Sequence, residues 1–133
     1  MIALLDTNVI IRFLTGYEEV KYQNLPPFFD SLEQGKRHVE LKLIVLFQVV
    51  FVLKSFYKIP KEKIVHGLLI LLKYKGITIT EKKVVCRTLK LWGEKNVEIV
   101  DCYLIACLEN DSQNLLYSYD RDFDGFGINR IEP

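Results

Sequence analysis

Cysteine and histidine are scarce in this sequence, and neither is arranged as in small secreted or zinc-binding domains. The three cysteines are an odd number, and none of them forms a Cys-x-x-Cys pair. This argues against a disulfide framework and against a cysteine-bound zinc ion, so we expect reduced, buried thiols in a cytoplasmic protein. His38 and His66 lie in no context typical of a general base, and we expect both to be solvated.

Long hydrophobic runs are also missing. The longest apolar stretch, residues 43–53, is interrupted by Gln48 and is too short to cross a bilayer. No positively charged region precedes the apolar residues at the N-terminus, so we expect no signal peptide. A membrane is therefore not an expected partner.

What the sequence does contain is enough apolar residues for one folded domain. The chain has 133 residues, of which 50% are hydrophobic, and this predicts a single globular domain over residues 1–133. Segments with helical apolar spacing alternate with short segments typical of strands. The helical segments are 9–14, 26–35, 44–57, 61–74, 81–94 and 98–106, and the strand segments are 2–5, 38–43, 77–79, 115–117 and 128–131. This alternation predicts an α/β fold with a mainly parallel sheet that is covered on both faces.

The first candidate for a functional residue is Asp6. It follows residues 2–5, which we interpret as a short and fully buried strand. Open α/β sheets bind their ligands at the carboxyl ends of strands, where Asp6 would lie. Thr7 and Asn8 can hydrogen-bond its carboxylate or cap the helix that follows.

Two further acids occupy comparable positions. Asp120 follows the strand at residues 115–117, with Ser118 just before it, and Asp101 lies in the first turn of an apolar helix, where the helix dipole favours a carboxylate. Each acid alone could equally be a helix cap or a turn residue. Their joint placement favours a shared site, which Asp122 could also approach.

Carboxylates that converge on one site repel one another unless protons or a cation relieve the repulsion. Mg²⁺ is typically held by one or two carboxylates together with waters and substrate phosphates. Such an ion can polarise a phosphodiester and activate a bound water. Asp6, Asp101 and Asp120 are therefore our candidate ligands for Mg²⁺ or Mn²⁺, either directly or through water.

Basic residues are concentrated in the middle of the chain. Between Lys54 and Lys95 there are eleven lysines or arginines and three acids, a net charge of +8, whereas the remaining residues have a net charge of −7. One interpretation is that these are ordinary solvated helix faces. The other is that the segment attracts the phosphates of a nucleic acid. Under that second interpretation the candidate RNA-binding residues are Lys58, Lys61, Lys82, Lys83 and Arg87.

Three short segments resemble motifs of the PIN domain family, and most closely of its VapC-type toxin ribonucleases. They are Leu5-Asp6-Thr7-Asn8-Val9-Ile10, Val100-Asp101-Cys102-Tyr103-Leu104-Ile105-Ala106 and Ser118-Tyr119-Asp120-Arg121-Asp122-Phe123. The resemblance implies a three-layer α/β/α sandwich with Mg²⁺ or Mn²⁺ in an acidic pocket. It also implies endonucleolytic cleavage of RNA, a homodimer, and a small cognate antitoxin protein that blocks the pocket.

One position departs from the family pattern. The family has an acid in the helix after the second strand, whereas this chain has Gln48, within Phe47-Gln48-Val49-Val50-Phe51. A neutral amide oxygen is a poorer ligand for a hard cation than a carboxylate, although Gln48 is expected to line the same pocket. Two alternatives to an active ribonuclease therefore stay open. One is a catalytically impaired PIN fold that binds RNA or a protein partner, and the other is a phosphatase-like hydrolase with Asp6 as its nucleophile.

Overall fold

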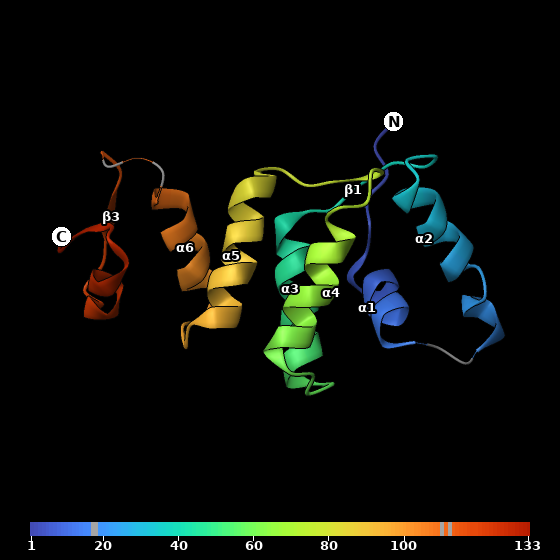
Figure 1. Cartoon of the computed structure of the whole chain (residues 1–133), viewed down its shortest axis with the longest axis horizontal. Helices are drawn as coiled ribbons and strands as arrows, with labels where there is room; N and C mark the ends of the chain where they lie inside the picture. Colours follow the sequence, from blue (N-terminus) through green and yellow to red (C-terminus); the bar gives the residue numbers. More distant parts are fainter. Residues whose placement is uncertain (17–18, 110, 112) are drawn as a thin grey trace. The chain divides into compact units, whose positions relative to one another are not determined.

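The computed structural model describes residues 1–16, 19–109, 111 and 113–133, and Figure 1 shows its ribbon. The described residues fall into two compact units, Met1–Lys82 and Lys83–Pro133. That residues 1–133 form a single domain stays a prediction.

The first unit is mainly helical. Its helices have apolar faces that meet in a shared core: α1 packs against α2 and α3, and α3 packs against α4 (Figure 1). Helix α3 is apolar on almost every side, and its inner residues Leu46, Val49, Val50 and Leu53 are buried. The helices are α1 (Thr7–Thr15), η1 (Val20–Tyr22), α2 (Leu25–Glu33), α3 (Leu43–Ser55) and α4 (Lys61–Leu71).

The strands of the first unit are short and parallel. β1 (Val39–Glu40) pairs with β2 (Ile77–Thr78). Leu4 forms a parallel bridge to Glu40, and the backbone N–H of Leu5 donates to the Glu40 carbonyl at 3.2 Å. This pairing places Leu4 and Leu5 beside β1, with Asp6 directly after them.

The interpretation of residues 2–5 as a fully buried strand is wrong. Leu5 is only 3% exposed, whereas Ile2 and Leu4 are 74% and 59% exposed. Successive side chains of a strand point to opposite faces, so Ile2 and Leu4 share the face opposite to Leu5. Ala3, on the same face as Leu5, is also exposed, so Leu5 is the one buried residue of this segment.

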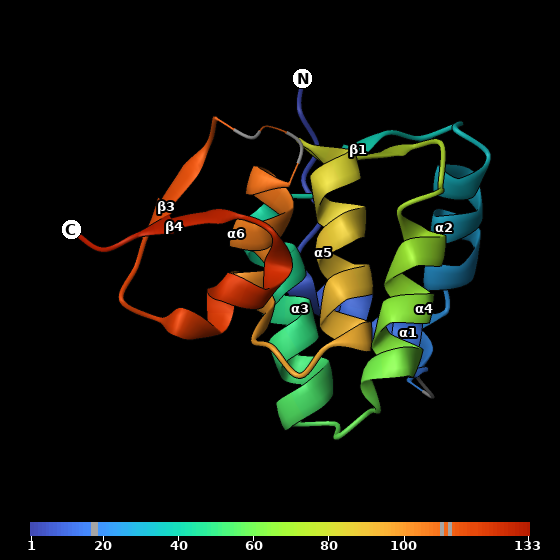
Figure 2. The same ribbon diagram turned by 60° about the vertical axis from the view of Figure 1, so that its left-hand side comes forward.

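The described part of the second unit contains two α-helices, one short 3-10 helix and a small parallel sheet. Helix α5 (Lys82–Glu94) begins at the boundary between the units, and α6 (Ile99–Leu108) follows it. β3 (Leu115–Tyr117) pairs in parallel with β4 (Asn129–Ile131), and the short helix η2 (Arg121–Phe126) connects them. Figure 2 shows the two strands side by side. No helix in the described part of the chain is long and apolar enough to span a membrane.

Candidate active site

A hollow of about 450 Å³ opens in the first unit at the start of α1. Its polar wall consists of Asp6, Thr7, Asn8 and Gln48. These residues come from two elements, because Asp6 to Asn8 open α1 and Gln48 lies in the middle of α3. The apolar part of the wall is formed by Ile11, Val52, Phe56 and Tyr57.

The backbone position of Asp6 leaves its carboxylate available within this hollow. Asp6 is the N-cap residue of α1 and has extended backbone angles, but its side chain forms no capping hydrogen bond. An aspartate at this position usually satisfies a free N–H of the first helical turn. The sequence alone allowed Asp6 to be a helix cap. In the structure its side chain does not have this role.

Gln48 is tied to Thr7 across the hollow. The Thr7 hydroxyl donates a hydrogen bond to Gln48 Oε1 at 2.9 Å. This bond uses one lone pair of the amide oxygen and holds the side chain toward the α1 side of the hollow. Glu40 is the acid that precedes Gln48 most closely in the sequence. Its carboxylate is paired with Lys42, whose Nζ donates to Glu40 Oε1 at 2.9 Å.

The acids of the second unit influence one another. Burial raises the pKa of the Asp101 carboxyl above its ordinary value, and the negative charges of Asp120, Glu98 and Asp122 raise it further. Each of these effects penalises the ionised form of Asp101. The carboxylates of these four acids are therefore close enough to repel one another.

Asp120 and Ser118 are held by local hydrogen bonds. The Asp120 N–H donates to Ser118 Oγ at 3.0 Å, and Asp120 Oδ1 accepts from the Asp122 N–H at 2.9 Å. Asp120 thus caps η2 with one oxygen, and a carboxylate has a second oxygen available for another partner. Asp124 is engaged differently, because Arg130 donates to both of its oxygens, at 2.7 and 3.1 Å, and lowers its pKa.

The raised pKa of Asp101 predicts how stability depends on pH. The folded state retains the Asp101 proton at pH values where the unfolded chain has lost it, so the free energy of unfolding falls as pH rises from about 3.8 through the folded pKa. We expect Asp101→Asn to remove this decrease and to be more stable than the unmodified protein at neutral pH without metal. Denaturant melts of both proteins across acidic and neutral pH measure the difference. Equal stability at every pH would contradict the mutual repulsion of these acids.

The candidate metal-ligand atoms in the two units are oxygens. They are carboxylates at Asp6, Asp101 and Asp120, together with the hydroxyl of Thr7 and the amide oxygen of Gln48. Oxygen ligands of this kind suit Mg²⁺ or Mn²⁺ rather than a soft metal. Within the described residues, no three or more His, Cys, Asp or Glu side chains are grouped so that they could hold a metal ion.

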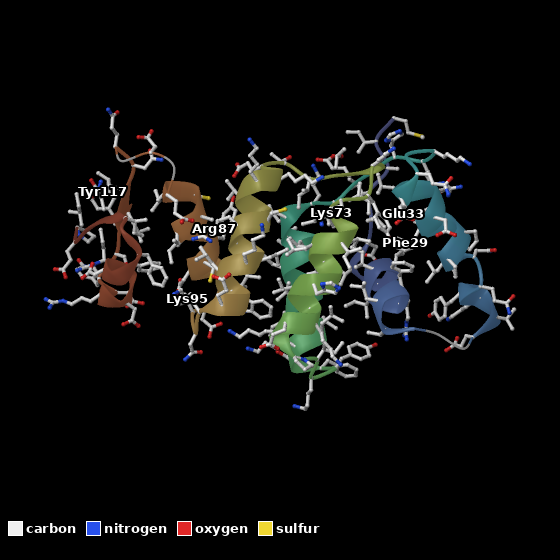
Figure 3. The ribbon with its side chains drawn as sticks, viewed as in Figure 1. Phe29, Glu33, Lys73, Arg87, Lys95 and Tyr117 are labelled. Carbon is white, nitrogen blue, oxygen red and sulfur yellow. The ribbon has the colours of Figure 1, made fainter. Side chains whose placement is uncertain are left out.

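The candidate RNA-binding cations differ in their surroundings. Lys58, Lys82 and Lys83 are exposed, and Lys61 is half-buried. Arg87 projects from α5 (Figure 3), and its guanidinium forms a two-pronged ion pair with Glu109, with Nε–Oε1 at 2.9 Å and Nη2–Oε2 at 3.0 Å. This pair raises the Arg87 pKa and neutralises its charge locally. Arg87 is therefore a weaker candidate for phosphate binding than the lysines.

Two aromatic residues at the hollow were not among the residues singled out from the sequence. Phe56 is 76% exposed and Tyr57 is half-buried, and both line the hollow that contains Asp6. Their rings meet edge to face, with centroids 5.1 Å apart. The signal available in the sequence was an adjacent aromatic pair at the end of an apolar helix, directly before Lys58.

Comparison with known proteins gives two findings. The family model described as "PIN domain" matches residues 3–128. The chain is also 25% identical over 130 residues to a protein of Aquifex aeolicus (strain VF5) named "VapC ribonuclease", and the alignment covers 98% of this chain and 96% of that protein. These findings confirm the predicted family resemblance, and with it the three-layer α/β/α fold class.

Proposed function

Because this chain belongs to the PIN domain family, we propose that it is a metal-dependent endoribonuclease of the toxin–antitoxin type. The observation that carries the proposal is the hollow that Asp6 lines together with Thr7, Asn8 and Gln48. The Asp6 carboxylate forms no helix-capping hydrogen bond there. The likeness to a protein named VapC ribonuclease along nearly the full length of both chains supports the choice of RNA as substrate.

The proposal assigns metal binding and catalysis to Asp6, Asp101 and Asp120. Their carboxylates supply the hard oxygen ligands that Mg²⁺ or Mn²⁺ prefers. When bound, such an ion polarises a phosphodiester and makes a bound water a stronger nucleophile. The raised pKa of Asp101 supports this assignment, because a cation would relieve the repulsion that raises it.

The remaining polar residues have supporting roles in this proposal. In the first unit, Thr7 orients the Gln48 amide, and Asn8 offers a further hydrogen-bonding group at the hollow. In the second unit, Ser118 fixes the backbone of Asp120, while Asp122 donates its N–H to the Asp120 carboxylate. The contacts with Ser118 and Asp122 restrict the positions that the Asp120 carboxylate can take, which lowers the cost of ordering it around an ion.

The proposal extends to partners. RNA phosphates would meet the exposed lysines of the basic segment, with Lys58, Lys82 and Lys83 the most accessible of the candidates. Lys61 and Arg87 complete the set of candidates for phosphate contact. We also propose a homodimer in the cytoplasm and a small antitoxin protein that covers the hollow at Asp6, the partners that the resemblance to VapC-type ribonucleases implies.

The direct test is RNA cleavage by the unmodified protein. We expect a mixture of single-stranded and hairpin RNAs to be cut internally in the presence of Mg²⁺ or Mn²⁺, and to stay intact when EDTA is added. Gel analysis of end-labelled RNA distinguishes internal cuts from trimming of the ends. If no RNA in a diverse set is cut at generous metal concentrations, the ribonuclease proposal is wrong.

A second candidate function is favoured by Gln48. In this alternative the chain retains the fold and binds RNA or a protein partner without cutting it, because the amide supplies no charge and its oxygen already accepts from Thr7. It predicts RNA binding that does not require a divalent ion. Metal-dependent hydrolysis that is lost in Asp6→Asn would exclude this alternative.

A further inference from the structure

A second hollow, of about 510 Å³, lies beside the first one in the same unit. Tyr57 lines both hollows, so the two share one wall. The second hollow is bounded by the ends of α1 and α3, by the segment that joins α3 to α4, and by the first turns of α4. Its volume is within the range of pockets that hold small organic groups.

The second hollow depends on a glycine in the middle of a helix. Gly67 lies within α4, where glycine is less favourable than alanine. Its backbone is helical, so no left-handed angle requires it, and a Cβ added there would meet only Leu14 Cδ2, at 3.7 Å. Neither strain nor close backbone packing explains this glycine. Because Gly67 has no side chain, it leaves space in the second hollow, which it lines.

The chemistry of the walls indicates what the second hollow could hold. Leu14, Leu53 and Ile64 provide apolar surface, and the exposed lysines Lys58 and Lys63 are the charged residues of the lining. A ligand that fits would combine an apolar surface with negative charge. A nucleobase with its phosphate has this combination.

We propose that the second hollow binds a nucleobase of the RNA strand, next to the phosphodiester that lies at Asp6. This inference rests on the proposed function and adds a position at which the substrate is recognised. Tyr57 lies between the two hollows, and the exposed ring of Phe56 stands against it, so consecutive bases could stack on this aromatic pair. Lys58 and Lys63 would then meet the phosphates that flank the bound base.

An RNA strand explains the lining better than an acidic peptide does. A peptide would account for the lysines and the apolar wall, but it gives no reason for the wall shared with the hollow that contains Asp6. The carboxylate of Asp6 repels acidic side chains as well as phosphates unless a cation is bound, and a cation there is part of the nuclease proposal. Binding of an acidic peptide is therefore one of the outcomes that the test distinguishes.

The test uses two substitutions at one position. Gly67→Leu places a side chain in the second hollow and removes no charge, and leucine is a better helix former than glycine. Gly67→Ala is the matched control, because its added Cβ makes only an ordinary contact with Leu14. The probes are the four nucleoside 5′-monophosphates, titrated without divalent metal and followed by NMR of the amide and methyl signals around the second hollow.

We expect at least one monophosphate to shift the signals of Leu14, Ile64 and residue 67 in the unmodified protein and in Gly67→Ala. In Gly67→Leu we expect the affinity to fall by about tenfold or more, since a lost base contact of this kind has an effect of that size. The proposal is overturned if no nucleotide shifts these signals, or if Gly67→Leu binds as well as Gly67→Ala. It is also overturned if a glutamate-rich synthetic peptide shifts the signals and no nucleotide does.

Failure of this inference can be distinguished from failure of the proposed function, because nucleotide binding is measured without cleavage. If RNA is cut but no monophosphate binds, the nuclease stands and the second hollow has no role in recognition. If monophosphates bind as expected but no RNA is cut, the recognition site stands and the nuclease proposal is wrong.

Discussion

Replacing Asp6 with asparagine is expected to lower the rate of metal-dependent RNA cleavage by at least about a hundredfold. A bound metal contributes several kcal/mol of charge stabilisation to such transition states, and each factor of ten in rate corresponds to about 1.4 kcal/mol. Asparagine keeps the size of the side chain but removes the charge. The measurement is the single-turnover rate with saturating Mn²⁺, taken together with the melting temperature.

The structure indicates that this substitution can be made without harming the fold. The Asp6 side chain forms no capping hydrogen bond, and asparagine is accepted at an N-cap as readily as aspartate. Asp30→Asn is the matched control, because Asp30 is an exposed acid on α2 in the same unit and does not line the hollow. A hundredfold loss in Asp6→Asn with an unchanged rate in Asp30→Asn would support the assignment. Equal rates in both variants would remove Asp6 from the active site.

The helices were largely predictable because their signal is local. The segment predicted at 44–57 corresponds to α3 at Leu43–Ser55, and the one predicted at 81–94 corresponds to α5 at Lys82–Glu94. Apolar spacing within a dozen residues is enough to indicate such helices. The strand predicted at 38–43 is shorter in the structure, where β1 covers only Val39–Glu40. Strand length depends on pairing with distant residues, which a local pattern does not contain.

The contacts that shape the candidate site are of this distant kind. The hydrogen bond from Thr7 to Gln48 joins residues 41 positions apart, and it decides which atom the amide oxygen contacts. The ion pair between Arg87 and Glu109 spans 22 positions, and it makes Arg87 a poorer phosphate ligand than its sequence context suggested. Charge pattern and residue type identified these side chains, but their partners follow from how the helices pack.

The acids illustrate how similar motifs acquire different roles. Asp6 follows a segment that is bridged to β1, Asp120 follows β3, and both precede a helix, yet only Asp120 uses its side chain as a cap. Asp124 lies four residues after Asp120 and is held by Arg130 from β4. Sequence alone could place an acid at a strand end. It could not tell which acid would be neutralised by a cation elsewhere in the chain.

Gln48→Glu is the second substitution with a large expected effect. It adds a carboxylate to the hollow that contains Asp6, and the Thr7 hydroxyl can donate to a carboxylate as well as to an amide. We expect the dissociation constant for Mn²⁺ to fall by about tenfold or more, because an added anionic ligand strengthens binding of a hard cation. Calorimetric titration with Mn²⁺ measures the affinity, and RNA cleavage is measured on the same samples.

The control for added charge is Gln34→Glu, at the exposed C-terminal end of α2 and away from the hollow. It should leave Mn²⁺ affinity and cleavage unchanged. If it strengthens Mn²⁺ binding as much as Gln48→Glu does, the effect is one of net charge and says nothing about the hollow.

The unmodified protein and Gln48→Glu together separate the two readings of this chain. If both cut RNA and the variant does so at lower Mn²⁺ concentration, three aspartates are sufficient for catalysis and Gln48 only weakens the site. If cleavage appears only in the variant, the active site is complete except for a carboxylate at position 48. The unmodified protein is then a binding module. If neither protein binds Mn²⁺ or cuts RNA, the missing acid is not the reason for inactivity. The ribonuclease assignment would then fail for the whole chain, whatever the residue at position 48.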